Sequence, residues 1–135
     1  MSASPILFDD FVPGALIGER VEIYDAEQAR RWQAIFGDGP QDGANGAAEG
    51  ASMAVVNMMR AYLNVVTPRP PGNVHARQQL RLRGVPRCGE AIRVTVHCVR
   101  KEIRRDRRYV DLQVHGAGEA GRDLFDGVIG LIWAA

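Results

Sequence analysis

Hydrophobic residues fall on nearly every side of one long segment in the middle of the chain, Glu49–Val66. A helix that is apolar on all sides is a buried helix, so this pattern predicts a helix in the protein core. At 1.5 Å per residue the helix would be about 27 Å long, which is also the length of a membrane span. Polar residues interrupt the segment, so a core helix of a soluble protein explains it better. These residues are Glu49, Asn57, Arg60 and Asn64.

Alternating apolar and polar residues predict strands before and after this helix. In the segment Val74–Arg83 the alternation gives one basic face, which is typical of the solvated side of an antiparallel sheet. The segment Leu124–Trp133 is nearly all apolar toward its end, so we expect a central or buried strand. Within it, Gly127 and Gly130 indicate bends or close backbone approach. Further strands are predicted at Val21–Tyr24, Ile92–Ile103 and Val110–Val114.

A second, amphipathic helix is predicted ahead of the central one. Asp25 is its N-cap candidate, Gln28 is the capping-box partner, and Gly37 ends it. One face of this helix carries Ala29, Trp32, Ile35 and Phe36. Residues 37–48 are so rich in glycine that we expect a loop there rather than regular structure. This loop is either a plain connection or one wall of a site, because it brings two aspartates to the start of the central helix.

The order of these elements predicts an α+β fold in one domain, residues 1–135. In this fold a strongly curved antiparallel sheet surrounds one long helix, and the last four strands form a meander. The start of the central helix is the place where chemistry would sit. Its first backbone N–H groups have no helical acceptor and carry the positive end of the helix dipole.

Composition and charge narrow the class of protein. The formal charge is +1, from 17 basic and 16 acidic residues, which argues against nucleic-acid binding driven by bulk charge. Basic residues cluster in Arg69–Arg108, which would suit a phosphate-bearing partner or simply form solvated strand faces. Cys88 and Cys98 have neither metal-ligand nor disulfide spacing, so we expect no metal site. Without a recognisable signal peptide, the expected location is cytoplasmic, with no membrane partner.

Four short phrases of the sequence resemble those of one known family, the MaoC-like branch of the hot-dog fold superfamily. Phe8–Gly14 looks like the opening phrase of that family, and Asp25–Asp38 looks like its first helix, which ends in Gly-Asp. Val85–Glu90 is similar to its Pro-x-x-x-Gly-Asp turn, and Phe125–Ile132 resembles its closing strand. The resemblance covers nearly the whole chain.

The resemblance implies a hot-dog fold and a homodimer whose two sheets join edge to edge, with paired active sites at the interface. It also implies an acyl-thioester substrate carried on coenzyme A or an acyl carrier protein, and no other cofactor. In the hydratases of this family, a Gly-Asp-x-Asn-Pro-x-His stretch supplies an Asp and a His that activate a water. The glycine of a His-Gly pair at the start of the central helix helps to hold the thioester carbonyl.

This chain keeps part of that pattern and lacks both histidines. Gly37-Asp38 matches the Gly-Asp, and Pro40 matches the proline if one residue is deleted, which places Asp42 at the catalytic histidine. Glu49-Gly50 replaces the His-Gly pair. The histidines of the chain lie on predicted strands and do not take the missing position: His75, His97 and His115.

The candidate catalytic residues each have a structural alternative. Asp38 is a general base if burial raises its pKa, or an ordinary turn residue in Gly-Asp-Gly-Pro. Gly50 lets a substrate carbonyl approach the helix N–H groups, or is simply a flexible helix entry. Glu49 is a carboxylate acting on a thioester carbonyl, or an acid stabilised by the helix dipole. Asp42 would share a proton with a neighbouring carboxylate.

The candidate binding residues are three arginines and a methionine. Arg69, Arg77 and Arg81 are candidates for holding coenzyme A phosphates, although exposed arginines are common on strands. Met53 is expected to line an apolar tunnel beside the central helix, together with Met58 or Trp32. The buried asparagines Asn57 and Asn64 are expected to satisfy backbone groups rather than to touch substrate.

Three functions remain open from the sequence. The first is hydration or dehydration of acyl thioesters, with Asp42 or Glu49 replacing the missing acid. The second is an acyl-CoA thioesterase that uses Glu49 or Asp38. The third is a non-catalytic member that binds acyl thioesters or only serves as a dimer partner.

Overall fold

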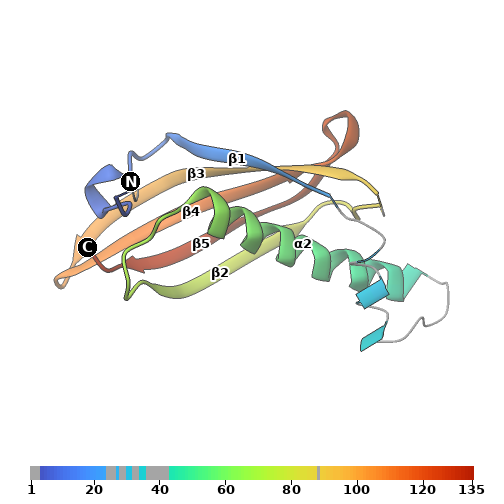
Figure 1. Ribbon diagram of the computed structural model, residues 1–135, viewed down its shortest axis with the longest axis horizontal. Helices are drawn as coiled ribbons and strands as arrows, with labels where there is room; N and C mark the ends of the chain where they lie inside the picture. The colour runs from blue at the N-terminus through green and yellow to red at the C-terminus, as the bar shows by residue number, and fades with distance from the viewer. Residues whose placement is uncertain (1–3, 24–26, 28–29, 32–33, 36–42, 88) are drawn as a thin grey trace.

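A computed structural model describes residues 4–23, 27, 30, 31, 34, 35, 43–87 and 89–135, without the side chains of 43–51. One long helix, α2, lies across one face of a curved sheet (Figure 1). The 3₁₀ turns are η1 (Phe8–Asp10) and η2 (Glu119–Gly121), and the helix is α2 (Gly43–Val65). The strands are β1 (Leu16–Ile23), β2 (Val74–Leu82), β3 (Ala91–Arg104), β4 (Arg107–Ala117) and β5 (Asp123–Trp133).

The predicted strands and the central helix are all present, and the predicted curved antiparallel sheet around one helix is confirmed. The predicted first helix falls largely outside the described residues. Those described within it are helical, and Arg31 forms an ion pair with Glu27 one turn earlier. Ile35 was assigned to the apolar face of this helix and is 75% exposed.

The strand order differs from the predicted meander. The sheet runs β1-β3-β4-β5-β2, with antiparallel pairing throughout, so only β3, β4 and β5 follow one another. The strand after the helix, β2, pairs with the last strand, β5, and not with its successor in the chain. Alternation of side chains predicts that a strand exists and which face it buries, but it does not specify the neighbouring strand. β1 and β2 are consequently the two edges of the sheet.

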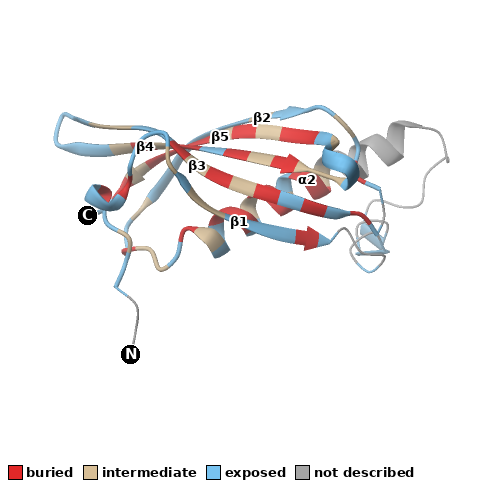
Figure 2. Ribbon diagram, turned by 90° about the horizontal axis from the view of Figure 1, so that it is seen from above, coloured by how far each residue is buried: buried red, intermediate tan, exposed pale blue. Residues whose placement is uncertain are grey.

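The core lies between α2 and the central strands (Figure 2). Strand β5 is buried or partly buried at every position after its exposed first residue, Asp123, so it is largely enclosed, as predicted. Full burial of a large apolar side chain stabilises the fold by about 1.5–3 kcal/mol, so the fully buried apolar side chains of this core dominate the stability of the protein. The largest fully buried apolar side chains are Trp133, Phe125, Met58, Ile92, Leu112, Leu124, Ile129 and Leu131.

A glycine allows the helix to lie close to the sheet. A Cβ at Gly127 of β5 would lie 2.5 Å from the Gln79 carbonyl oxygen and 3.3 Å from the Met58 sulfur. Neither the backbone of β2 nor the packed helix can move aside cheaply, so the position excludes a side chain. The predicted close backbone approach at Gly127 is confirmed. Because of it, Met58 of α2 packs directly over the paired strands β5 and β2.

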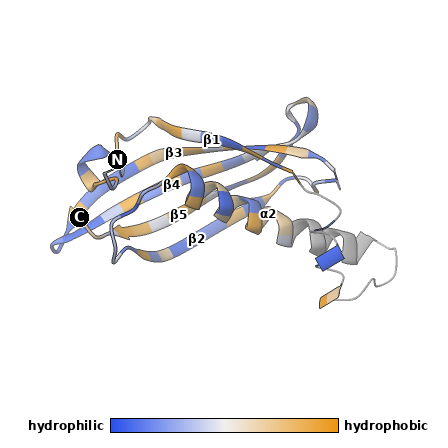
Figure 3. Ribbon diagram, viewed as in Figure 1, coloured by the Kyte–Doolittle hydropathy of each residue, from blue (hydrophilic) through white to orange (hydrophobic). Residues whose placement is uncertain are grey.

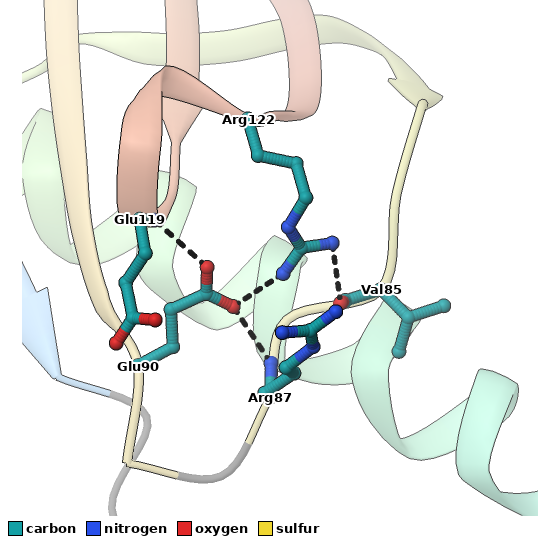
Figure 4. A network of polar contacts seen from close by, with 5 residues as sticks. All are labelled: Val85, Arg87, Glu90, Glu119 and Arg122. Carbon is teal, nitrogen blue, oxygen red and sulfur yellow. Dashed lines mark hydrogen bonds and ion pairs between the residues drawn. The ribbon is translucent and has the colours of Figure 1, made fainter.

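A buried carboxylate ties two turns together at one end of the sheet (Figure 4). Glu90 precedes β3 and is only 2% exposed. Its oxygens accept hydrogen bonds from the backbone N–H groups of Arg87 and Glu119, both at 2.9 Å. The Arg122 guanidinium donates to it at 2.6 Å and also donates to the Val85 carbonyl at 3.2 Å. The turn before β3 is thereby fixed to the β4–β5 connection.

These contacts determine the protonation state of Glu90. Burial alone would raise its pKa, but the two backbone N–H donors and the Arg122 guanidinium together lower it below the ordinary value. The carboxylate is therefore ionised and fully paired. Gly118 is part of the same arrangement, because a Cβ there would collide with the Glu90 carboxylate.

Candidate functional site

The central helix begins earlier than the sequence predicted. It starts at Gly43, so the residues Gly43–Ala48, which were expected to form a loop, are helical. Three of these six residues are alanines, and alanine is the strongest helix former, which offsets the two glycines. The prediction of a loop through residue 48 is wrong for this segment.

This earlier start changes the argument for Glu49 and Gly50. They are the seventh and eighth residues of α2 rather than its first ones. Only the first four N–H groups of a helix lack helical acceptors, so the backbone of Gly50 is not an orphan donor at the helix end. The position of the Glu49 side chain lies outside the described part of the structure. Their proposed roles in chemistry stay predictions.

The two aspartates lie outside the described residues. These aspartates are Asp38 and Asp42, and Pro40 and Trp32 also lie outside the described residues. Of the predicted tunnel lining, Met58 is fully buried and Met53 is 8% exposed. Three hollows that the described residues line lie elsewhere, and none of them is lined by Met53 or Met58.

One face of α2 carries both the candidate catalytic residue Gly50 and the buried side-chain amide of Asn57. Gly50, Met53 and Asn57 are spaced i, i+3 and i+7, so they share one face of the helix. Asn57 is 0% exposed, and among the described residues neither its side-chain oxygen nor its side-chain nitrogen has a hydrogen-bond partner. The expectation that Asn57 satisfies buried backbone is wrong. Asn64 does make such a bond, to the Arg60 carbonyl at 2.7 Å, although it is exposed.

An unsatisfied buried amide is costly, at about 1–3 kcal/mol for each unpaired group. Buried polar groups in native proteins are nearly always paired, so an exception needs an explanation, and binding of a polar ligand is one. Asn57 offers a neutral donor and a neutral acceptor on the stripe that carries Gly50. The sequence contained this signal, since a polar residue interrupts an apolar helix two turns after the assigned glycine.

The three candidate arginines do not form one cluster within the chain. Arg69 follows α2, and its guanidinium donates to the carbonyls of Leu63 and Val66 at 2.9 and 2.8 Å, which caps the end of the helix. Arg77 pairs with Asp111 of β4 at 3.6 Å. Arg81 lies opposite Asp126 in the sheet register.

The sheet separates these arginines. Leu80 lies beside Gly127 and Met58, so it points toward the helix, and its neighbour Arg81 points to the opposite face. The register of β2 with β5 puts Arg77 on that same outer face, whereas Arg69 lies at the end of α2. One chain therefore presents two arginines on the outer face and one on the helix side.

Strand β2 is exposed along its length. All of its residues are exposed except Leu80, which is partly buried, and hydrophilic residues occupy much of it (Figure 3). The prediction that its basic face is solvated is confirmed, but its apolar positions Val74 and Leu82 are also about half exposed, at 51% and 50%. An edge strand of nine residues with unpaired backbone groups is a template for pairing with another chain.

Solved structures share this architecture along most of the chain, although no family model matches it and no curated protein matches its sequence. The (R)-hydratase PhaJ1 from Pseudomonas aeruginosa superposes with a TM-score of 0.74 and 16% identity, covering 96% of this chain and 86% of PhaJ1. The MaoC-like dehydratase from Rhodospirillum rubrum superposes with a TM-score of 0.75 and 15% identity, covering 96% of this chain and 98% of the dehydratase. This chain has the hot-dog fold.

A chain of the HadBC 3R-hydroxyacyl-ACP dehydratase complex from Mycobacterium tuberculosis has the same fold. Its TM-score is 0.64 at 15% identity, over 84% of this chain and 90% of that one. The predicted fold class is thus confirmed by the one helix packed against a five-stranded antiparallel sheet and by these hot-dog structures. In the described part of the chain, no helix combines the length and apolarity needed to cross a membrane.

Proposed function

We propose that this chain is a MaoC-like protein that acts on acyl thioesters, as an enoyl-thioester hydratase or the reverse dehydratase. The observation that carries the proposal is the hot-dog fold shared over 96% of the chain with an (R)-hydratase and a MaoC-like dehydratase. The stripe of Gly50, Met53 and Asn57 adds a polar group inside an otherwise apolar helix face.

In hydration, water adds across the carbon–carbon double bond of the enoyl thioester, with no change in overall oxidation state. Asp38 would take a proton from the water as its oxygen bonds to C3. Asp42 or Glu49 would deliver a proton to C2 in place of the missing histidine. The neutral amide of Asn57 would donate to a substrate oxygen, and Gly50 would leave room for the thioester carbonyl beside the helix.

We further propose that β2 joins the sheet of a second copy edge to edge, giving a homodimer. The support is the exposure of β2 on both faces, together with its half-exposed apolar residues Val74 and Leu82. Pairing through β2 would cover unpaired backbone groups and these side chains at once. A cytoplasmic location accompanies this proposal.

The experiment that tests the function follows a medium-chain enoyl-CoA by two signals. Loss of the enone absorbance without release of free thiol supports hydration, and Asp38→Asn should abolish it while the matched variant Asp9→Asn keeps it. Release of thiol would contradict hydration in favour of a thioesterase, and Glu49→Gln should then remove activity. Saturable binding with neither signal would instead identify a non-catalytic acyl-thioester protein.

A further inference from the structure

A hollow lies at the C-terminal end of α2. Figure 1 shows the chain turning back there into β2. The volume of the hollow is about 370 Å³, within the range of about 300–1,000 Å³ that is usual for small-molecule sites. We call it the helix-end pocket. Its polar walls are Tyr62, Arg69, Asn73 and His75, and Pro70 and Leu131 contribute apolar walls. Tyr62 comes twelve residues after Gly50, about 18 Å along the helix, so this pocket is distinct from the proposed acyl-thioester face.

Asn73 contributes a hydrogen-bond donor without an acceptor. Its side-chain oxygen accepts from the Ala134 backbone N–H at 2.7 Å, which defines the orientation of the amide. The nitrogen of the same amide is buried and has no hydrogen-bond partner among the residues that the structure describes. A ligand acceptor reaches this N–H₂ group only if the walls of the pocket move apart slightly, and pairing it would then remove the cost of an unpaired buried donor.

Tyr62 and Arg69 add further donors to the same pocket. Tyr62 is 5% exposed, and burial raises the pKa of its hydroxyl, an effect that the charge of Arg69 only partly opposes, so the hydroxyl stays protonated and can donate. The Arg69 guanidinium lies 5.5 Å from the centre of the Tyr62 ring. Because one of its nitrogens is held by the two carbonyls at the end of α2, the guanidinium is oriented before any ligand arrives.

The charge balance of the pocket is positive. The end of α2 carries about half a negative charge from the helix dipole, and the full positive charge of Arg69 exceeds it. His75, whose ring lies 6.5 Å from that of Tyr62, contributes a ring nitrogen that can also donate. The donors of these side chains lie beside apolar residues, and that combination recognises an anion with a hydrocarbon body.

We propose that the helix-end pocket binds the carboxylate of a small apolar carboxylic acid. The carboxylate oxygens accept from Asn73, Tyr62 and Arg69, and the hydrocarbon chain lies against Pro70 and Leu131. This site goes beyond the proposed acyl-thioester function, because a free acid carries neither a thioester nor a phosphate. Binding here would give the protein a separate site for sensing or holding a free acid.

The test is titration of the full chain with sodium hexanoate, followed by NMR of the backbone amides and of the Asn73 side-chain amide. We expect saturable shifts confined to the pocket residues. Asn73→Asp keeps the acceptor for Ala134 and replaces the donor by a negative oxygen, so it should weaken binding about tenfold or more. Tyr62→Phe keeps the ring and should weaken binding about threefold to tenfold.

Matched controls make the outcome decisive. Arg93→Met removes one exposed positive charge near the start of β3 and should leave hexanoate binding unchanged. Hexanol, which lacks the charge, and inorganic phosphate, which lacks the hydrocarbon, should each bind far more weakly than hexanoate. Equal binding of phosphate, or unchanged binding by both Asn73→Asp and Tyr62→Phe, would overturn the proposal. If Asn73→Asp does not fold, Tyr62→Phe alone decides.

Discussion

Two buried polar side chains in this protein have opposite environments. Glu90 carries a full charge and has a donor for each of its oxygens, from Arg87, Glu119 and Arg122. Asn57 is neutral, and the described part of the chain supplies no hydrogen-bond partner for either of its polar atoms. The comparison teaches that burial alone does not reveal function. A satisfied buried group stabilises the fold, whereas an unsatisfied one reduces stability and calls for a partner that the described residues do not supply.

The largest expected effect comes from removing the satisfied group. Glu90→Ala leaves Arg122 without its carboxylate and two N–H groups without acceptors, so we expect a loss of about 3–5 kcal/mol in the free energy of unfolding. Glu119→Ala is the matched control, because it removes an exposed carboxylate but keeps the N–H that donates to Glu90. It should change stability by less than about 0.5 kcal/mol. Chemical denaturation measures both, and equal effects would contradict the structural role of Glu90.

Removing the unsatisfied group should act in the opposite direction. Asn57→Leu replaces the amide by an apolar group of the same branching, so we expect the free energy of unfolding to rise by about 1–3 kcal/mol. The same variant should lose enoyl-thioester binding or turnover. Asn64→Leu, which changes an exposed asparagine on the same helix, is the control and should do neither. Loss of stability in Asn57→Leu with full activity would show that Asn57 is only a packing residue.

The sequence predicted the elements that depend on a local pattern, but not the contacts between residues that are distant in the chain. The hydrophobic pattern predicted the long helix, whose segment is apolar on all sides, and the strands, in which burial of one face imposes a repeat of two residues. It did not predict that β2 pairs with β5, since pairing depends on contacts distant in sequence. The resemblance of Val85–Glu90 to a family turn placed Glu90 in a turn, but nothing in the sequence placed it in the core, because its partners Glu119 and Arg122 come about thirty residues later.

The candidate site was predictable only in part. Gly50 and Met53 were assigned from a resemblance and from the apolar helix, and the structure places them on one stripe with Asn57. The separation of Arg77 and Arg81 from Arg69 required the register of β2, which composition does not contain. The roles of Asp38 and Asp42 stay predictions, because they lie outside the described residues.

A smaller effect concerns pH. The pKa of Glu90 is lowered in the folded protein, so the folded state binds fewer protons than the unfolded state in the acid range. Its contribution is therefore complete above the unfolded pKa of about 4.3 and is lost as the pH falls through the lowered folded value. The stability difference between the wild type and Glu90→Gln should shrink as the pH falls below about 4. A difference that stays constant as the pH falls well below about 4 would contradict the paired carboxylate.

The smallest expected effect concerns the edge of the sheet, and it tests the proposed homodimer. Strand β2 contains arginines at 77 and 81 and no acidic residue, so antiparallel pairing of two copies brings like charges together. Exposed unit charges about 6 Å apart repel by about 0.7 kcal/mol in water, and salt screens this repulsion. Dimerisation measured by sedimentation should therefore tighten severalfold as the ionic strength rises.

The matched variants separate this edge from the rest of the basic surface. The double variant Arg77→Gln/Arg81→Gln should dimerise more tightly at low salt and lose most of the salt dependence. Arg104→Gln/Arg108→Gln removes the same charge from the β3–β4 hairpin and should behave like the wild type. If dimerisation of the wild type weakens with salt, opposite charges must attract the two chains. Two β2 strands do not supply opposite charges, because β2 contains no acidic residue. The pair would then have to form through another surface or with a chain whose edge is acidic.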